Sequence, residues 1–156
     1  KRKAIGTPTT AAAPVEKRAA RYRSSCAAGV RDRISRAMSQ RMYLIERSDE
    51  SASGALAHRF TVLGSTGNVY EVRIAKGPSC SCPDHGRGNV CKHILFVFLK
   101  VLKVRFDSPL IYQTALLQSE LDSIFFAAPF SPGAATASAS VRAAFARATG
   151  QPVKGA

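Results

Sequence analysis

The amino-acid sequence predicts a small α+β fold in which a β-hairpin, a cysteine-containing loop and an apolar helix are flanked by amphipathic helices. Three observations lead to this prediction. Two short runs of alternating apolar residues surround a glycine-rich turn, and three of the chain's four cysteines lie between residues 80 and 91. Apolar residues also recur at helical spacing on either side of this region, as expected of helices that pack on a shared core.

The first 41 residues carry most of the positive charge. They contain eleven Lys or Arg and two acidic residues, whereas residues 42–130 contain nine basic and eight acidic residues. Residues 1–29 show little apolar periodicity, so we expect a disordered basic arm there. Clustered Lys and Arg attract nucleic acid, acidic proteins or nuclear import machinery, and a merely solvated tail remains open as the alternative.

Residues 30–47 are predicted to form one amphipathic helix. Apolar side chains recur there at helical spacing, with arginines on the other positions; the apolar stripe is Ile34, Met38, Met42 and Ile45. The following residues, 48–57, are small and polar, and we expect them to form a loop.

Residues 59–63 and 69–74 are predicted to pair as a β-hairpin. Tyr70, Val72 and Ile74 alternate with charged residues, which is typical of a half-buried strand. The two runs are separated by Gly64-Ser65-Thr66-Gly67-Asn68, whose glycines and asparagine suit the positive φ angles of a tight reversal.

Residues 94–104 are apolar on most faces and are about as long as an average helix, which favours a buried helix. Their β-branched and aromatic content would also suit a strand, so that alternative stays open. Ser108 and Pro109 then resemble the N-cap and first turn of a helix over residues 108–128, packing on the preceding unit. Its predicted apolar stripe is Tyr112, Leu116, Leu117, Leu121, Ile124 and Phe125.

Residues 131–156 contain many Ala, Ser and Gly residues and few large ones. We expect a low-complexity linker or tail there, with a weak alanine-rich helix over residues 141–149 as the alternative.

Cys80, Cys82, Cys91 and His93 are predicted to bind one structural Zn²⁺ ion. Thiolates and an imidazole in a set of four match the ligands that tetrahedral zinc prefers. Eight residues separate the two pairs, and closing so short a loop costs little entropy. In a regular strand Cys80 and Cys82 would point to opposite faces, so the chain must bend between them.

Other assignments of these residue types are weaker. Two cysteines one residue apart are awkward to join as a disulfide, although buried thiols remain an alternative. His85 could replace His93 as the fourth ligand, but only His93 leads directly into a helix that would fix its ring. We expect His58 to be a surface or otherwise satisfied histidine and Cys26 to be a free thiol.

Ser79-Cys80-Ser81-Cys82-Pro83-Asp84 and Cys91-Lys92-His93, between a hairpin and an apolar helix, resemble the SWIM-type zinc finger over residues 58–104. A wider resemblance, carried by residues 40–45, 64–70 and 99–104, is to proteins in which a SWIM finger precedes a RING finger. Those relatives are ubiquitin ligases or are inferred to be. No cysteine follows Cys91, so the resemblance implies that any ligase activity needs a RING outside this chain.

These features favour a non-catalytic zinc-binding module that recruits a protein partner, as the recognition part of a ubiquitin-ligase-like protein. The alternative is a nucleic-acid-binding finger of a nuclear or transposase-like protein, with the basic arm adding affinity. A catalytic zinc site usually keeps one position open, so four ligands argue against an enzyme and against a small-molecule substrate. No run approaches the roughly 20 apolar residues that span a bilayer, and we expect an intracellular protein, nuclear or cytoplasmic.

Overall fold

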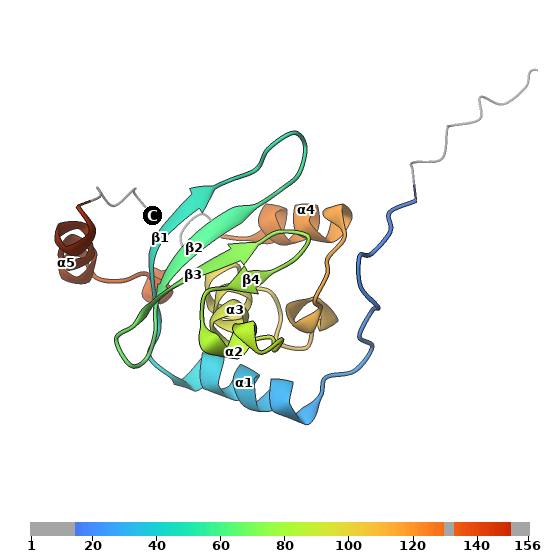
Figure 1. Cartoon of the computed structure of the whole chain (residues 1–156), viewed down its shortest axis with the longest axis horizontal. Coiled ribbons are helices and arrows are strands. Elements are labelled where there is room, and N and C mark those ends of the chain that lie inside the picture. The colour runs from blue at the N-terminus through green and yellow to red at the C-terminus, as the bar shows by residue number, and fades with distance from the viewer. Residues whose placement is uncertain (1–14, 130–132, 151–156) are drawn as a thin grey trace, which may run out of the picture.

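A computed structural model describes residues 15–129 and 133–150, which form a small α+β fold, as the sequence predicts (Figure 1). In chain order the elements are α1 (Ala28–Ser39), β1 (Tyr43–Asp49), β2 (His58–Leu63), β3 (Val69–Ile74), β4 (Ser79–Cys80), α2 (Pro83–Gly86), α3 (Lys92–Phe96), the π-helix η1 (Val97–Val101), the 3-10 helix η2 (Pro109–Tyr112), α4 (Gln118–Ala127), the 3-10 turn η3 (Gly133–Ala135) and α5 (Ala139–Thr149).

The four strands form one antiparallel sheet in the order β1-β2-β3-β4. The predicted hairpin between β2 and β3 is confirmed, with Leu63 opposite Val69 at its closed end. The Gly64 amide donates to the Asn68 carbonyl at 2.7 Å, and Gly67 has a φ of 91°. That angle is strained for a residue with a Cβ atom, which explains the glycine in the turn.

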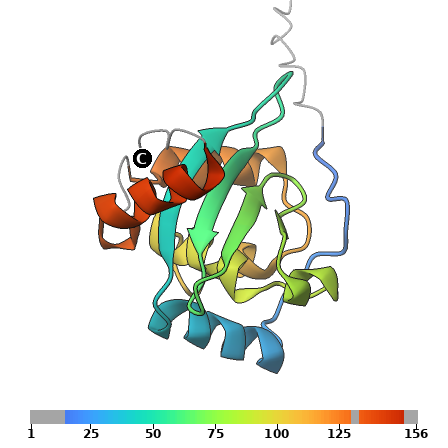
Figure 2. The same cartoon turned by 60° about the vertical axis from the view of Figure 1, so that its left-hand side comes forward.

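The apolar segment after the cysteines is a helix, which excludes the strand alternative. It starts as α3 and continues into η1, where the Leu102 amide donates to the Val97 carbonyl five residues back, at 2.8 Å. Phe96 and Phe98 are fully buried in the hydrophobic core. α1 packs on the far side of α3, so α3 forms the middle layer of the fold (Figures 1 and 2).

The helix predicted over residues 30–47 is wrong in its second half. α1 ends at Ser39, and Tyr43–Asp49 form the edge strand β1, paired with β2 from Tyr43↔Leu63 to Asp49↔His58. A β-bulge between Leu44 and Glu46 turns the adjacent Leu44 and Ile45 both into the protein, at 1% exposure each. Met42 and Ile45 are therefore both buried without belonging to a helix, and their spacing in the sequence resembles a continued helical stripe.

The helix predicted over residues 108–128 is interrupted. Ser108 does act as a cap, since its hydroxyl accepts from the Leu110 amide at 3.3 Å, but η2 ends at Tyr112 and α4 begins only at Gln118. Between these helices the backbone forms a long-range hydrogen bond: the Leu116 amide donates to the Lys76 carbonyl at 2.7 Å. This long-range contact replaces the helical hydrogen bonds that a continuous helix would need.

Residues 15–27, the described residues before α1, form no helix or strand, yet they are attached to the fold. The buried Gln113 side chain accepts from the Arg23 amide at 2.8 Å and donates to the Arg23 carbonyl at 2.7 Å. Arg18 pairs with both carboxylate oxygens of Glu120, at 2.8 and 2.9 Å. The expectation of a disordered arm over residues 1–29 therefore differs from the structure for its second half, and residues 1–14 lie outside the described residues.

The expected C-terminal linker also differs from the structure within residues 133–150. Leu44 forms a parallel bridge with Thr136, and the Ala137 amide donates to the Leu44 carbonyl at 2.7 Å. α5 then lies beside β1 (Figure 2). Residues 131–132 and 151–156 of the predicted tail lie outside the described residues. Within the described part of the chain, no helix has the length and apolarity needed to cross a membrane.

Candidate metal centre

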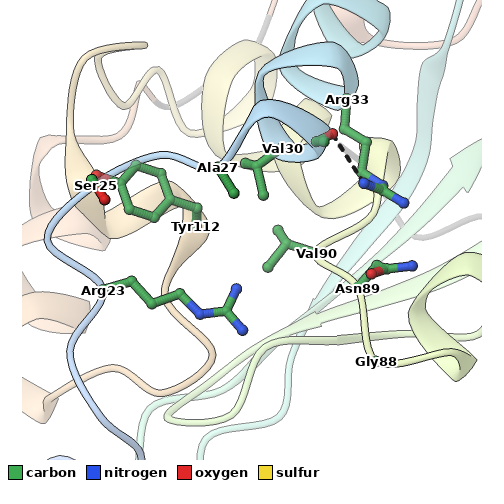
Figure 3. Close-up of a pocket in the computed structure, with 10 residues that line it drawn as sticks. Arg23, Ser25, Ala27, Val30, Arg33, Gly88, Asn89, Val90 and Tyr112 are labelled. Atoms are coloured by element: carbon green, nitrogen blue, oxygen red, sulfur yellow. Dashed lines mark hydrogen bonds between the residues drawn. The ribbon is translucent and has the colours of Figure 1, made fainter.

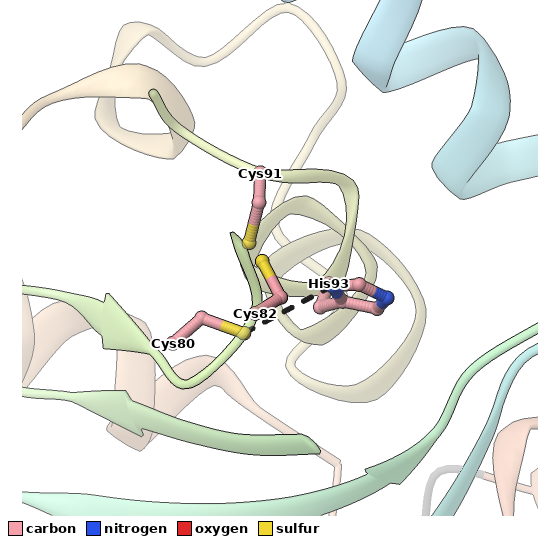
Figure 4. A group of neighbouring side chains, drawn as sticks. All are labelled: Cys80, Cys82, Cys91 and His93. Carbon is pink, nitrogen blue, oxygen red and sulfur yellow. Dashed lines mark hydrogen bonds between the residues drawn. The ribbon is translucent and has the colours of Figure 1, made fainter. Parts of the chain in front are cut away.

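The structure brings together the four residues predicted to bind zinc. One donor atom from each of Cys80, Cys82, Cys91 and His93 lies within 4.8 Å of the other three, and all four residues are buried. The three sulfur atoms and the imidazole ring point toward one another (Figure 4). Their chemistry and their convergence are those of a tetrahedral zinc site made wholly of protein ligands.

A bend after β4 solves the problem that Cys80 and Cys82 would face opposite ways in a regular strand. Cys80 ends β4 opposite Val72, and Ser81 continues the pairing by donating its amide to the Glu71 carbonyl at 3.0 Å. Cys82 is already the N-cap of α2. The strand therefore ends between the two cysteines, and the next residue turns its sulfur back toward the first.

Two of the thiols sit at the starts of helices, where backbone amides stabilise a thiolate. The Cys82 sulfur accepts from the His85 amide at 3.4 Å, and the Cys91 sulfur accepts from the Ile94 amide at 3.5 Å. Pro83 follows Cys82 in the first turn, where its missing N–H removes no helical hydrogen bond. Both sulfur atoms are thus held by hydrogen bonds that favour their charged, metal-binding form.

His93 is fixed from two sides. It lies in the first turn of α3, with 4% of its surface exposed, and its ring packs on Tyr70 with centroids 4.3 Å apart. Its Nδ1 atom lies 3.9 Å from the Cys80 sulfur. Donors of a tetrahedral zinc ion with Zn–S near 2.3 Å and Zn–N near 2.0 Å lie about 3.5 Å apart, so Nδ1 is placed as the ligand atom.

The ionisation of the thiols also suits a divalent cation. Hydrogen bonding with Cys80 lowers the pKa of Cys91 to about 4. The same contact, together with burial, raises the pKa of Cys80 far above its usual range, and burial raises the pKa of Cys82. Neighbouring buried thiols cannot all ionise near neutral pH, because like charges repel in a low dielectric. A bound Zn²⁺ ion supplies the positive charge that lets all three do so.

Asp84 joins the loop between the ligand pairs to α1. Its carboxylate accepts from the Arg33 guanidinium at 2.7 and 2.9 Å and from the Asn89 side-chain amide at 2.9 Å. The hydrogen bonds from Arg33 lower the pKa of Asp84 to about 2. Sequence reasoning did not identify this pair, since Arg33 lies 51 positions before Asp84. In the sequence, the only indication of this pair is that an acidic residue, Asp84, stands two positions after the ligand Cys82.

The other residues considered from the sequence lie outside the cluster. His85 directs Nδ1 to the Asn89 carbonyl at 3.2 Å, so His93 rather than His85 belongs to the group. His58 stacks on Phe125 with centroids 4.3 Å apart, and burial lowers its pKa. Cys26 is a half-buried free thiol.

Residues 70–102 match the family model described as the SWIM zinc finger. This segment starts in β3, contains all four clustered residues and ends just after η1. It is a SWIM zinc finger whose ligand set suits one structural zinc ion.

Part of the chain is similar to mitogen-activated protein kinase kinase kinase 1. It is 34% identical over 95 residues to the proteins of Rattus norvegicus and Mus musculus, and 33% identical to that of Homo sapiens. The aligned region covers 60% of this chain but only 6% of each of those proteins. No solved structure matches the chain.

We expect one zinc ion per purified chain. Replacing Cys82 with Ser removes a thiolate ligand, so Cys82→Ser should carry markedly less zinc after dialysis, measured by inductively coupled plasma mass spectrometry. Cys26→Ser makes the same chemical change outside the cluster and should retain its zinc. Wild-type protein without zinc, or an equal loss in both variants, would contradict the site.

Removing the metal should unfold the finger before the rest of the fold. Structural zinc contributes on the order of 10 kcal/mol of apparent binding free energy, and this energy is available for folding because the unfolded chain has no preformed site. With a chelator, amide exchange should increase most over residues 70–98, while β1, β2 and α4 keep part of their protection. Unchanged protection over residues 70–98 after complete zinc removal would show that the apolar core alone suffices.

The Arg33–Asp84 pair should stabilise the folded protein by about 1 kcal/mol, because it is bidentate and only partly exposed to solvent. A double-mutant cycle with Arg33→Gln and Asp84→Asn, followed by urea unfolding of the zinc-loaded protein at neutral pH, measures this coupling. Asp84 has a lower pKa in the folded protein. The contribution of Asp84 to the free energy of unfolding is therefore full above about pH 4 and is lost as the pH falls toward about 2. Additive effects of the two substitutions would contradict the coupling.

Proposed function

We propose that this chain is a non-catalytic, zinc-stabilised module that binds a protein partner. The buried ligand set is the observation that carries this proposal. A catalytic zinc ion needs a position open to water or substrate, whereas here three thiolates and one imidazole supply four ligands from the protein. In such a site the metal holds surfaces in place and leaves recognition to the side chains around it.

We further propose that the module belongs to a larger ubiquitin-ligase-like protein. The support is the resemblance of residues 40–45, 64–70 and 99–104 to proteins in which a SWIM finger precedes a RING finger. Partial similarity to much longer proteins is consistent with a module of a larger chain. Three of the four cysteines are in the finger, so transfer of ubiquitin would depend on a RING supplied from elsewhere.

Nucleic-acid binding by a nuclear protein is the second candidate. The observation that favours it is the charge of α1 and its surroundings, where Arg31, Arg36 and Arg41 are exposed. The central residues are nearly neutral, however, and this weakens the case for phosphate binding along the whole finger.

A capture experiment with two variants distinguishes these functions. Tagged wild-type chain, Cys82→Ser and Cys26→Ser are each incubated with cell lysate, with and without nuclease, and bound proteins are quantified by mass spectrometry. A protein module should enrich partners that are lost in Cys82→Ser, retained in Cys26→Ser and unchanged by nuclease. Loss of all enriched proteins after nuclease treatment would instead favour the nucleic-acid function.

The isolated chain should not transfer ubiquitin. A RING recruits the ubiquitin-conjugating enzyme through its own metal-organised surface, and this sequence has no second set of cysteines to form one. An in vitro reaction with activating enzyme, conjugating enzymes and ubiquitin should give no chain-dependent product. Ubiquitin conjugates that require the wild-type chain and disappear with Cys82→Ser would contradict this expectation.

A further inference from the structure

A cleft of about 420 Å³ lies between α1 and the zinc-binding loop. Its walls contain four basic side chains, Arg33, Arg36, Arg87 and Lys92, and one acidic side chain, Asp84. Tyr70 and the ligands Cys82, Cys91 and His93 also line it. The cleft therefore combines an excess of positive charge with the outer surface of the zinc centre.

Three of the four cations form no ion pair among the described residues, and of these three only Arg87 contributes to lowering the pKa of Asp84. Arg33 is committed to Asp84 through two hydrogen bonds and to the Gly29 carbonyl through a third at 2.9 Å. Lys92 donates only to neutral oxygens, Gln40 Oε1 at 2.6 Å and Ser65 Oγ at 3.3 Å. Arg36 and Arg87 are exposed, and within residues 15–129 and 133–150 their side chains form no ion pair.

The zinc centre does not account for this excess. A Zn²⁺ ion with three thiolates and a neutral imidazole carries a single formal negative charge, and the same cleft is lined by three cations that form no ion pair among the described residues. All four ligand positions are filled by protein, so an additional anion must bind through the side chains rather than through the metal. The cleft is thus left with a formal charge of about +2. One phosphate monoester carries a charge of about −1.5 to −2 near neutral pH and would neutralise it.

We propose that this cleft binds the phosphate group of a phosphorylated side chain on a partner protein. Guanidinium groups recognise phosphate oxygens through charge-assisted, paired hydrogen bonds, and Arg36 and Arg87 provide two of them from opposite walls. Lys92 provides a third positive group on α3. The proposal rests on the proposed function, because it defines the chemistry of the partner that the module recruits.

The distribution of charge favours a single phosphate group over a polynucleotide. The Asp84 carboxylate lies in the wall and would repel a second phosphate beside the first. A neighbouring cleft of about 320 Å³ at the start of α1 has an apolar floor that includes Val30 and Val90 (Figure 3). Its cations are Arg33, which is bound to Asp84 and to the Gly29 carbonyl, and Arg23, whose side chain forms no ion pair among the described residues (Figure 3). The positive charge therefore gathers beside the zinc centre and does not continue evenly along α1.

The test is titration of the zinc-loaded full chain with three pentapeptides, Gly-Gly-phosphoserine-Gly-Gly, its phosphotyrosine counterpart and the unphosphorylated serine peptide. Binding is followed by ¹H–¹⁵N chemical shifts, including the arginine side-chain signals. We expect saturable shifts at Arg36, Arg87 and Lys92 with at least one phosphopeptide and none with the unphosphorylated one. Arg36→Gln and Arg87→Gln should each weaken binding about tenfold, since each removes a hydrogen bond to a charged group.

Arg31→Gln is the matched control, because it removes one positive charge from the same helix outside the cleft. It should leave phosphopeptide affinity nearly unchanged, and zinc content with the ¹H–¹⁵N spectrum verifies that every variant is folded. The proposal is overturned by the absence of shifts at the cleft, by equal weakening in Arg31→Gln, or by a DNA duplex that binds the same cations more tightly than either phosphopeptide.

Failure of this proposal can be distinguished from failure of the proposed function. If captured partners depend on the finger but resist both phosphatase treatment and Arg87→Gln, the chain is a protein-binding module and the phosphate site is wrong. If no nuclease-resistant partner depends on the finger, the proposed function fails as well.

Discussion

The fold depends on one electrostatic constraint, which is that three buried cysteines beside an imidazole can all be thiolates only around a divalent cation. Without such a cation, the cost of gathering thiolates in a low dielectric would keep at least part of the cluster protonated. With it, β4, α2 and α3 acquire fixed positions, because Cys80 ends a strand while Cys82 and Cys91 each cap a helix. The metal centre therefore determines where three of the elements begin or end.

The zinc centre and the apolar core are continuous with each other. His93 lies in α3, and the same helix carries Phe96 and, through η1, Phe98 into the hydrophobic core. On the opposite side of the site, Asp84 binds Arg33 of α1, which itself packs on α3. A displacement of the zinc loop would thus disturb both the core helix and the helix outside it, so the metal stabilises more than its own loop.

The sequence predicted the parts of the fold that depend on neighbouring residues. The hairpin over β2 and β3, the buried α3 helix and the grouping of the four ligands follow from local patterns, turn chemistry and ligand spacing. It did not predict β1, the interruption after Tyr112 or the pairing of residues 136–137 with Leu44. Each of these depends on hydrogen bonds between distant segments, which local propensity does not contain. The Arg33–Asp84 pair was missed for the same reason.

The position of the cleft links its charge to the metal. Arg87 lies inside the eight-residue loop between the ligand pairs, and Lys92 lies between two ligands, so zinc binding determines where both cations sit. Arg36 belongs to α1, whose distance from the loop is held by Arg33 and Asp84. A chain without zinc would keep the same residues and net charge, yet it would not hold these three cations around one space. Affinity that depends on their arrangement must then require the metal, whereas attraction that depends on total charge alone would not.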